Sequence, residues 1–201
     1  MSKTWFNVLN EQVSLSKYEN VNIREHLDDL TNEAKNYDTV VELGRQNMCS
    51  TLAILLGNPK KFITVDTDEP TDRWIYRKEL ASKYCDIVGV DYEYRIADTL
   101  QMEPIECEMM FIDTFHSYEQ LYRELNIYHK SVSKTIVMHD TVSFGQTDEP
   151  SSAIKTDLLD KRFIGKAGLA NALDDFLLEN KEWTKSRIET KNNGMSYITR
   201  V

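Results

Sequence analysis

Short apolar runs alternate with amphipathic segments along most of the chain. Runs rich in β-branched and aromatic residues are typical of buried strands, and five occur here: residues 39–44, 62–66, 92–96, 109–113 and 135–139. Elsewhere apolar residues recur at helical spacing and predict helices over residues 23–37, 50–56, 72–84, 118–128 and 167–179. Because strands and helices alternate, the pattern predicts parallel βαβ units.

The end of the chain has a different pattern. Two strand-like runs, 183–188 and 195–201, flank Asn192-Asn193-Gly194, which is a strong signal for a hairpin turn. We therefore predict an α/β fold, a doubly wound Rossmann-like and mostly parallel sheet with a C-terminal antiparallel hairpin. We interpret the 201 residues as one domain with four parts: an N-terminal arm and helix (1–37), a core (38–140), a flap loop (141–166), and a C-terminal helix and hairpin (167–201).

Composition limits the partners and the compartment. A formal net charge of -9 argues against a nucleic-acid backbone as the main partner. The three cysteines are far apart and form no CxxC, which argues against a zinc knuckle and favours a reduced, cytoplasmic setting. We expect no signal peptide and no membrane partner, since the apolar run Leu52–Leu56 is too short to span a bilayer.

Ionisable residues follow the fourth and fifth predicted strands. Asp113 and His116 come directly after one apolar run, and His139 and Asp140 end the next. Parallel strands joined by a helix end at the same edge of the sheet, where open α/β sheets bind ligands. Two carboxylates and two imidazoles in one crevice suit a divalent metal and a proton acceptor.

A series of strand-end motifs resembles a known family. The motifs are Glu42-x-Gly44, Asp66, Ala97-Asp98, Asp113-x-x-His116-Ser-Tyr-Glu and His139-Asp140-Thr. Over about residues 38–200 the chain resembles the class I S-adenosylmethionine-dependent methyltransferases. It is most similar to the small-molecule and sugar O-methyltransferase branch, which includes the macrocin and mycinamicin O-methyltransferases. The last two motifs are fairly specific, whereas the others are generic for the fold.

The resemblance implies a binding site for S-adenosylmethionine in the core. Glu42 and Gly44 match the motif whose turn wraps the methionine part of the cofactor. Ser50-Thr51 matches the pair that opens the next helix, where backbone N–H groups can hold a carboxylate. Asp66 matches the acid that binds the ribose hydroxyls, and Asp98 matches the acid near the adenine.

The same resemblance implies a metal-assisted reaction. Asp113 and Asp140 correspond to metal ligands, His116 to the general base, and His139 stands where relatives have a further acidic ligand. Hard oxygen ligands suit Mg²⁺ or Mn²⁺. The expected activity is S-adenosylmethionine-dependent O-methylation of a sugar or other small hydroxylated molecule, with Asp113 and His116 as catalytic residues.

Other interpretations stay open. Met48-Cys49 stands where the family usually has glycines, which favours a catalytically degenerate binding or assembly module. A different metal-dependent reaction in the same crevice is a further alternative. Asp113 and Asp140 also suit helix or turn caps, and His139 suits a packed strand end. We interpret His26 and His129, on amphipathic helices, as surface residues.

Two segments outside the core carry weaker expectations. The flap from Thr141 to Gly165 directly follows Asp140, and long loops in compact domains are often lids or binding loops. We expect it to shape the acceptor pocket. Residues 1–20 are mostly polar with scattered aromatic residues. We interpret them as an arm that packs against the fold, and its aromatic residues favour a homo-oligomer.

Overall fold

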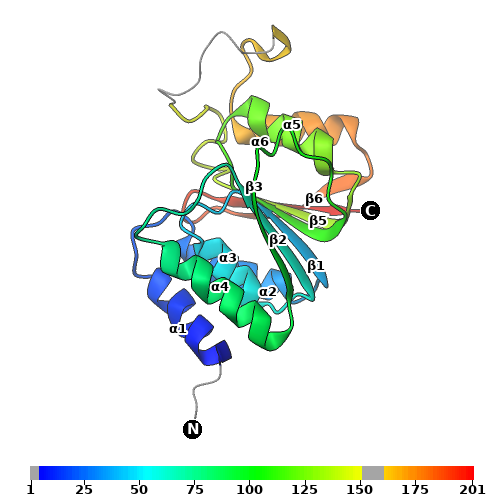
Figure 1. Ribbon diagram of the computed structural model, residues 1–201. Coiled ribbons are helices and arrows are strands. Elements are labelled where there is room, and N and C mark those ends of the chain that lie inside the picture. The colour runs from blue at the N-terminus through cyan, green and yellow to red at the C-terminus, as the bar shows by residue number, and fades with distance from the viewer. Residues whose placement is uncertain (1–4, 151–160) are drawn as a thin grey trace.

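One mixed sheet organises the residues that the computed structural model describes, which are 5–150 and 161–201. Its strand order is β3-β2-β1-β4-β5-β7-β6 (Figure 1). The strands are β1 (Thr39–Leu43), β2 (Lys61–Asp66), β3 (Asp91–Ile96), β4 (Cys107–Ile112), β5 (Val132–His139), β6 (Trp183–Glu189) and β7 (Met195–Arg200). The order reverses between β1 and β4, so the crevice of a doubly wound sheet opens beside these two strands.

Strand directions confirm the predicted fold class. β1 pairs in parallel with β2 and with β4, and β4 pairs in parallel with β5. β7 runs antiparallel to both β5 and β6, and the turn before it has positive φ at Asn192, Asn193 and Gly194. Val41 and Leu43 of β1 and Met110 of β4 are buried, as expected for parallel strands covered on both faces.

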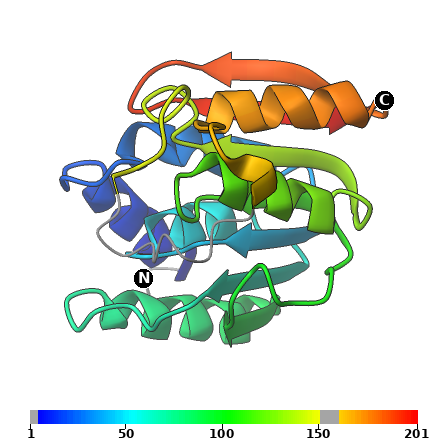
Figure 2. The same cartoon turned by 90° about the horizontal axis from the view of Figure 1, so that it is seen from above.

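Helices cover both faces of the sheet. Figure 1 shows α1–α4 below it and α5 and α6 above, and Figure 2 shows α5 and α6 side by side. The helices are α1 (Trp5–Ser16), η1 (Arg24–His26), α2 (Leu27–Ala34), α3 (Cys49–Leu56), α4 (Ile75–Val88), α5 (Tyr118–Tyr128), η3 (Lys161–Phe163) and α6 (Leu169–Glu179). The core is therefore in two layers, one against each face of the sheet.

Three expectations about the helical layers need correction or completion. The predicted N-terminal arm contains a regular helix, α1, whose Leu9 and Val13 are buried. His26 is fully buried rather than exposed, and its Nε2 lies 2.9 Å from the carbonyl oxygen of Lys191. His129 is also buried, with its ring edge-on to Phe176. The surface interpretation of both histidines is therefore wrong.

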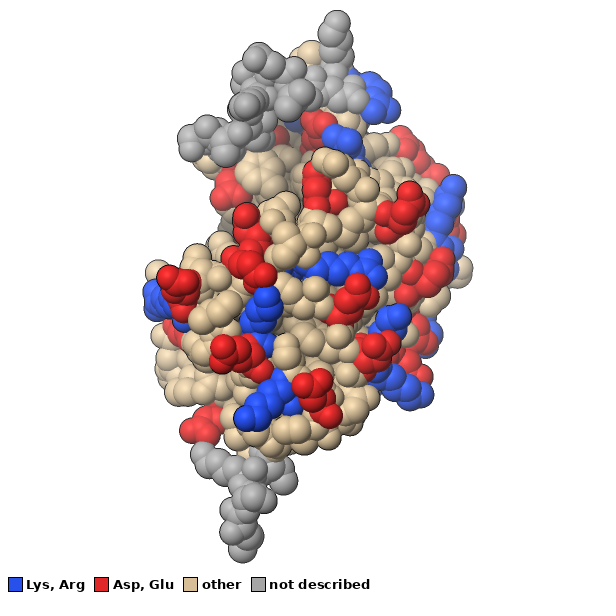
Figure 3. Space-filling view, in the orientation of Figure 1, with Lys and Arg blue, Asp and Glu red and all other residues tan. Residues whose placement is uncertain are grey.

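Surface features bear on partners. On the face seen in Figure 3, lysines and arginines are interspersed with carboxylates rather than gathered into a basic stripe. Within the described ranges, no helix has both the length and the apolar character needed to cross a bilayer. Residues 151–160 of the predicted flap lie outside the described residues.

Candidate functional site

Four of the predicted side chains meet at the carboxyl ends of β4 and β5. His116 Nε2 lies 2.9 Å from Asp140 Oδ2 and 3.3 Å from Asp113 Oδ1. His139 Nδ1 lies 3.1 Å from the same Asp140 oxygen and 3.4 Å from Asp113 Oδ1. The two imidazoles thus bridge the two carboxylates, as the βαβ argument predicts.

Asp140 reaches this position through an unusual backbone. Its φ is 59°, in the left-handed region that costs energy for a residue other than glycine. The turn places its carboxylate inside the crevice, where only 1% of the side chain is exposed. Asp140 Oδ1 and His139 Nε2 are buried and have no hydrogen-bond partner among the residues that the structure describes. An unsatisfied buried carboxylate oxygen at a strained position is the kind of feature found at functional sites.

Opposite charges dominate the electrostatics of the crevice. Burial alone would lower the pKa of His116, but its hydrogen bonds to Asp113 and Asp140 raise the pKa to about 10. Burial would likewise lower the pKa of His139, but the carboxylates of Asp113 and Asp140 raise it to about 10. Burial would raise the pKa of Asp140, yet the imidazoles lower it. Two imidazolium groups therefore offset the carboxylates.

The donor set fits a divalent cation. Asp113, His139 and Asp140 each offer one ligand atom, and these atoms all lie within 4.8 Å of one another. The two carboxylates supply the hard oxygen donors that suit Mg²⁺ or Mn²⁺. The hollow that Asp113, His116 and His139 line holds about 10 Å³, which is the scale of one water or ion. A sugar would therefore have to approach from outside this hollow.

A close backbone approach joins the first motif to this crevice. Gly44 has φ +83°, and a Cβ at that position would lie 2.1 Å from the carbonyl oxygen of Asp113. Only glycine meets both requirements without moving β4 away from β1. The turn after β1 therefore lies against the first candidate metal ligand.

Glu42 points into the interior. Its Oε2 accepts hydrogen bonds from the hydroxyls of Thr51 and Thr64, each at 2.6 Å. Burial raises its pKa to about 7, and the hydroxyls of Ser50, Thr51 and Thr64 oppose the rise. Glu42 and Thr51 therefore brace β1 against α3 and β2, while Glu42 Oε1 has no hydrogen-bond partner among the described residues.

The loop before α3 keeps a left-handed backbone conformation although Met48 and Cys49 stand where glycines are expected. Met48 has φ 62°, the left-handed conformation that glycine adopts easily, and it precedes α3. Both side chains are fully buried among the helices below the sheet. The two residues that replace the family's glycines thus place their sulfur atoms in the core. The N-terminus of α3 still presents backbone N–H groups near Ser50.

The remaining predicted cofactor residues lie at neighbouring strand ends. Asp66 Oδ2 accepts the backbone N–H groups of Arg45 and Gln46 at 2.8 and 3.0 Å. Asp98 is exposed after β3, and its carboxylate accepts from the N–H of Leu100 at 2.9 Å. Each carboxylate has lone pairs beyond these bonds, so ribose hydroxyls or an adenine amino group could still donate to them.

A buried glutamate on α5 links two of these strand ends. Glu124 Oε1 accepts the hydroxyl of Thr99, which follows Asp98, at 2.5 Å. Its Oε2 accepts the hydroxyl of Thr114, which follows Asp113, at 2.7 Å. Glu124 thereby fixes the loop after β3 relative to the loop after β4.

We expect the carboxyl of Glu124 to make folding stability depend on pH. Burial raises its pKa from the ordinary value of 4.5 to about 7, so the folded state holds this proton more tightly than the unfolded chain. Stability from this group is therefore complete below pH 4.5 and is lost as pH rises to about 7. Each pH unit in that window costs at most about 1.4 kcal/mol. Urea unfolding should show that, from pH 5 to pH 8, wild type loses more stability than Glu124→Gln does. Equal losses in the two proteins would contradict this prediction.

The sequence argument missed two residues that contact His116. Glu149, from the loop after β5, places its Oε2 2.9 Å from His116 Nδ1. Phe144 from the same loop stacks on the His116 ring at 4.9 Å. No periodicity marks such loop residues, and the only available signal was the position of the loop directly after Asp140.

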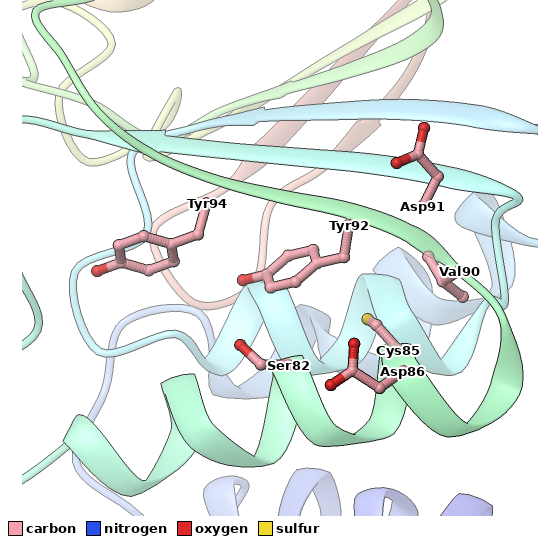
Figure 4. A pocket seen from close by; sticks show the side chains of 7 residues that line it. All are labelled: Ser82, Cys85, Asp86, Val90, Asp91, Tyr92 and Tyr94. Atoms are coloured by element: carbon pink, nitrogen blue, oxygen red, sulfur yellow. The ribbon is translucent and has the colours of Figure 1, made fainter.

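A second hollow lies far from the crevice in the sheet order. It has a volume of about 410 Å³ between α4 and the edge strand β3 (Figure 4). Figure 4 shows Tyr92 and Tyr94 of β3 facing Ser82, Cys85 and Asp86 of α4. β2 and β1 separate β3 from β4, so this groove shares no residue with the candidate site.

Comparison with solved structures identifies proteins of similar fold. The chain resembles a Podospora anserina methyltransferase with S-adenosylhomocysteine bound (14% identity, TM-score 0.59, covering 99% of this chain and 88% of that one). It resembles an O-methyltransferase from Bacillus cereus in complex with S-adenosylhomocysteine (10% identity, TM-score 0.60, 100% and 92% covered). A putative caffeoyl-CoA O-methyltransferase from Staphylococcus aureus is also similar (13% identity, TM-score 0.60, 99% and 93% covered).

No protein-family model and no curated protein sequence matches the chain. At 10–14% identity the structural similarity establishes the fold, a Rossmann-like methyltransferase fold that spans nearly the whole chain.

Proposed function

We propose that this protein is a class I S-adenosylmethionine-dependent O-methyltransferase, metal-assisted, that acts on a hydroxyl of a sugar or other small molecule. The observation that carries the proposal is the convergence of Asp113, His116, His139 and Asp140 beside the turn at Gly44. A scaffold has no need of two carboxylates and two imidazoles at one point. The similar structures that hold S-adenosylhomocysteine support the cofactor, and the motifs after β4 and β5 support the macrocin- and mycinamicin-like branch.

Each side chain has a role in this proposal. The glycine turn and the start of α3 would hold the methionine part of the cofactor, while Asp66 and Asp98 would accept hydrogen bonds from the ribose and adenine. Bound S-adenosylmethionine supplies an activated methyl group. Asp113, Asp140 and His139 Nδ1 would hold Mg²⁺ or Mn²⁺, whose charge lowers the pKa of an acceptor hydroxyl.

His116 would accept the proton that the acceptor hydroxyl loses. Hydrogen bonds to the carboxylates of Asp113 and Asp140 favour the protonated imidazole. A bound cation would offset those carboxylates and so lower the pKa of His116, which would leave Nε2 free to take a proton. Methyl transfer then needs the acceptor oxygen, the methyl carbon and the leaving sulfur in line, which positioning by the crevice provides.

Calorimetric titration tests the cofactor part of the proposal. Wild-type protein is titrated with S-adenosylmethionine and S-adenosylhomocysteine, with and without Mg²⁺. Binding in the micromolar range supports the methyltransferase. If the folded protein binds neither ligand at millimolar concentration, the binding-module alternative replaces it, and Met48-Cys49 is the feature that favours that alternative. Metal-dependent turnover without the cofactor would instead favour a different reaction in this crevice.

We expect Asp140→Asn to weaken metal binding. The substitution removes a buried anionic ligand, and losing even an outer-shell partner commonly costs about tenfold in affinity. Titration with Mn²⁺ should show a loss of about tenfold or more. Asp174→Asn removes an exposed carboxylate that pairs with Lys185 and should bind Mn²⁺ as wild type does. Equal affinities in the two variants would remove Asp140 from the ligand set.

Two further parts of the proposal concern the surroundings of the site. We propose that the flap shapes the acceptor pocket, since its described start, residues 141–150, contacts His116. We also propose that copies of the chain associate through the N-terminal segment, where Phe6, Leu15 and Tyr18 are exposed.

A further inference from the structure

We propose that Glu149 is the positioning residue for His116: its carboxylate accepts the Nδ1–H of the imidazole and thereby presents Nε2 to the crevice. The inference rests on the proposed function, since it takes His116 as the proton acceptor. It goes further by assigning a role to a loop residue that none of the strand-end motifs contains.

Two contacts join Glu149 to His116. The carboxylate Oε2 lies 2.9 Å from Nδ1, and the backbone N–H of Glu149 donates to the carbonyl oxygen of His116 at 2.7 Å. Because backbone and side chain both engage the same residue, the carboxylate cannot shift along the loop without breaking a second bond. The geometry therefore differs from that of an exposed ion pair, which usually has one flexible contact.

Two contacts fix the plane of the His116 ring and its rotation within that plane. Phe144 stacks parallel to it, with 3° between the planes and 4.9 Å between the centroids, and so sets the plane. Glu149 sets the rotation within that plane. Nε2 then faces Asp140 Oδ2 at 2.9 Å, on the side where an acceptor hydroxyl bound at the metal site would lie.

The preceding residue anchors the loop. Asp148 Oδ1 accepts the N–H of Tyr118, at the start of α5, at 2.8 Å. The same oxygen accepts the N–H of Gly168, just before α6, at 2.7 Å. One carboxylate thus satisfies two helix N-termini, where a negative charge is favoured. Glu149 is therefore attached to a fixed point between two helices.

The chemistry of a base explains why a carboxylate belongs at Nδ1. A neutral imidazole carries one proton, and it can accept another only at the opposite nitrogen. An acceptor at Nδ1 retains the proton there and leaves Nε2 as the basic atom. Without Glu149, both tautomers and other ring rotations become accessible, and a smaller fraction of molecules has Nε2 correctly placed.

Nuclear magnetic resonance of the imidazole N–H groups tests the contact directly, without acceptor or cofactor. The Nδ1–H proton of His116 should give a signal protected from exchange in wild type. Its absence in His116→Ala assigns it to this ring, and the strong correlation of Nε2, but not Nδ1, with the Cδ2 proton distinguishes it from Nε2–H. Glu149→Ala should lose the signal. Glu149→Gln should keep it, because the carboxamide oxygen still accepts. Persistence in Glu149→Ala, or loss in both variants, would overturn the proposal.

Kinetics test the consequence of the contact. Glu149→Ala should lower kcat by about 10- to 100-fold and leave KM for S-adenosylmethionine unchanged. Glu149→Gln should largely restore kcat. Glu179→Gln, which removes an exposed carboxylate bonded to Tyr122, serves as the control and should behave as wild type. An unchanged kcat in Glu149→Ala would overturn the role. Failure to bind S-adenosylmethionine would count against the proposed function instead, and the resonance experiment would still decide whether Glu149 holds His116.

Discussion

Replacing His116 with alanine is expected to reduce turnover by about 100- to 10,000-fold while leaving the affinity for S-adenosylmethionine nearly unchanged. The imidazole lies at the crevice between Asp113 and Asp140 and contacts none of the residues predicted to hold the cofactor. Its removal therefore takes away the proton acceptor and a partner of the two carboxylates, and leaves the residues predicted to hold the cofactor in place. Turnover is measured as formation of S-adenosylhomocysteine with a hydroxylated acceptor that wild type methylates, and affinity by calorimetry.

Asp66→Ala is expected to have the opposite effect and mainly weaken cofactor binding. Its carboxylate lies at the end of β2 and orders the turn through the N–H groups of Arg45 and Gln46. Losing charged hydrogen bonds to ribose hydroxyls costs about 1.5–3 kcal/mol each, so cofactor affinity should fall by about tenfold or more. The two variants should thus separate catalysis from binding. An equal loss of affinity in both would mean that His116 supports the cofactor rather than the proton transfer.

The strand ends could be predicted because parallel strands leave a simple signature. β1, β4 and β5 are buried over most of their length, and the buried part of each strand is mainly apolar up to the residue that reaches the crevice. The crossover rule then places Asp113 and His139 at one edge without any knowledge of the coordinates. The distances between them, and the left-handed turn at Asp140, depend on packing that no spacing rule contains.

For His26 and His129, the spacing of apolar residues indicated burial, but the polar residue type led to a prediction of exposure. His26 precedes Leu30 and Ala34 by one and two steps of four residues, and all three are buried. His129 follows Leu121 and Leu125 in the same rhythm. Both histidines therefore lay on apolar stripes, and their polarity was wrongly given more weight than their position. Histidine can be buried when one nitrogen finds a partner, as His26 does at the Lys191 carbonyl.

Long-range polar partners leave no trace in periodicity. Glu149 is 33 residues from His116, and it reaches the ring only because Asp148 fixes the loop against α5 and α6. The same limit applies to Arg77 of α4, which contacts residues from α1 and from the loop after β1. The sequence could show that Arg77 shares a stripe with Ala81 and Cys85, but not which groups it meets.

Arg77→Met is expected to destabilise the protein by about 3 kcal/mol or more, since breaking a buried ion pair leaves its partner uncompensated. Arg77 is fully buried and pairs with Glu19 through Nη2 at 2.5 Å. Its Nη1 donates to the carbonyl oxygen of Asn47 at 2.8 Å. Methionine retains most of the packing volume but none of the donors. Urea unfolding monitored by circular dichroism measures the loss.

Arg73→Met provides the control. Arg73 is exposed, and its guanidinium lies 4.4 Å from the ring of Trp74, the same ring over which Arg77 lies at 4.2 Å. The control therefore removes a cation–aromatic contact without removing a buried charge, and its effect should stay below about 1 kcal/mol. A similar loss in both variants would show that stacking on Trp74, and not the buried pair, accounts for the stability.

Arg77 should also influence cofactor binding, because Asn47 belongs to the turn between β1 and α3 that is proposed to wrap the methionine part. The carbonyl oxygen of Asn47 loses its guanidinium donor in Arg77→Met, whereas Glu19→Gln removes only the charge partner on the side of α1. If Arg77 holds the turn, S-adenosylmethionine should bind more weakly to Arg77→Met than to Glu19→Gln under conditions where both are folded. If the two variants lose stability but bind the cofactor equally well, Arg77 serves only to fasten α1 to the rest of the fold, and the turn keeps its shape through Asp66 and the left-handed backbone at Met48.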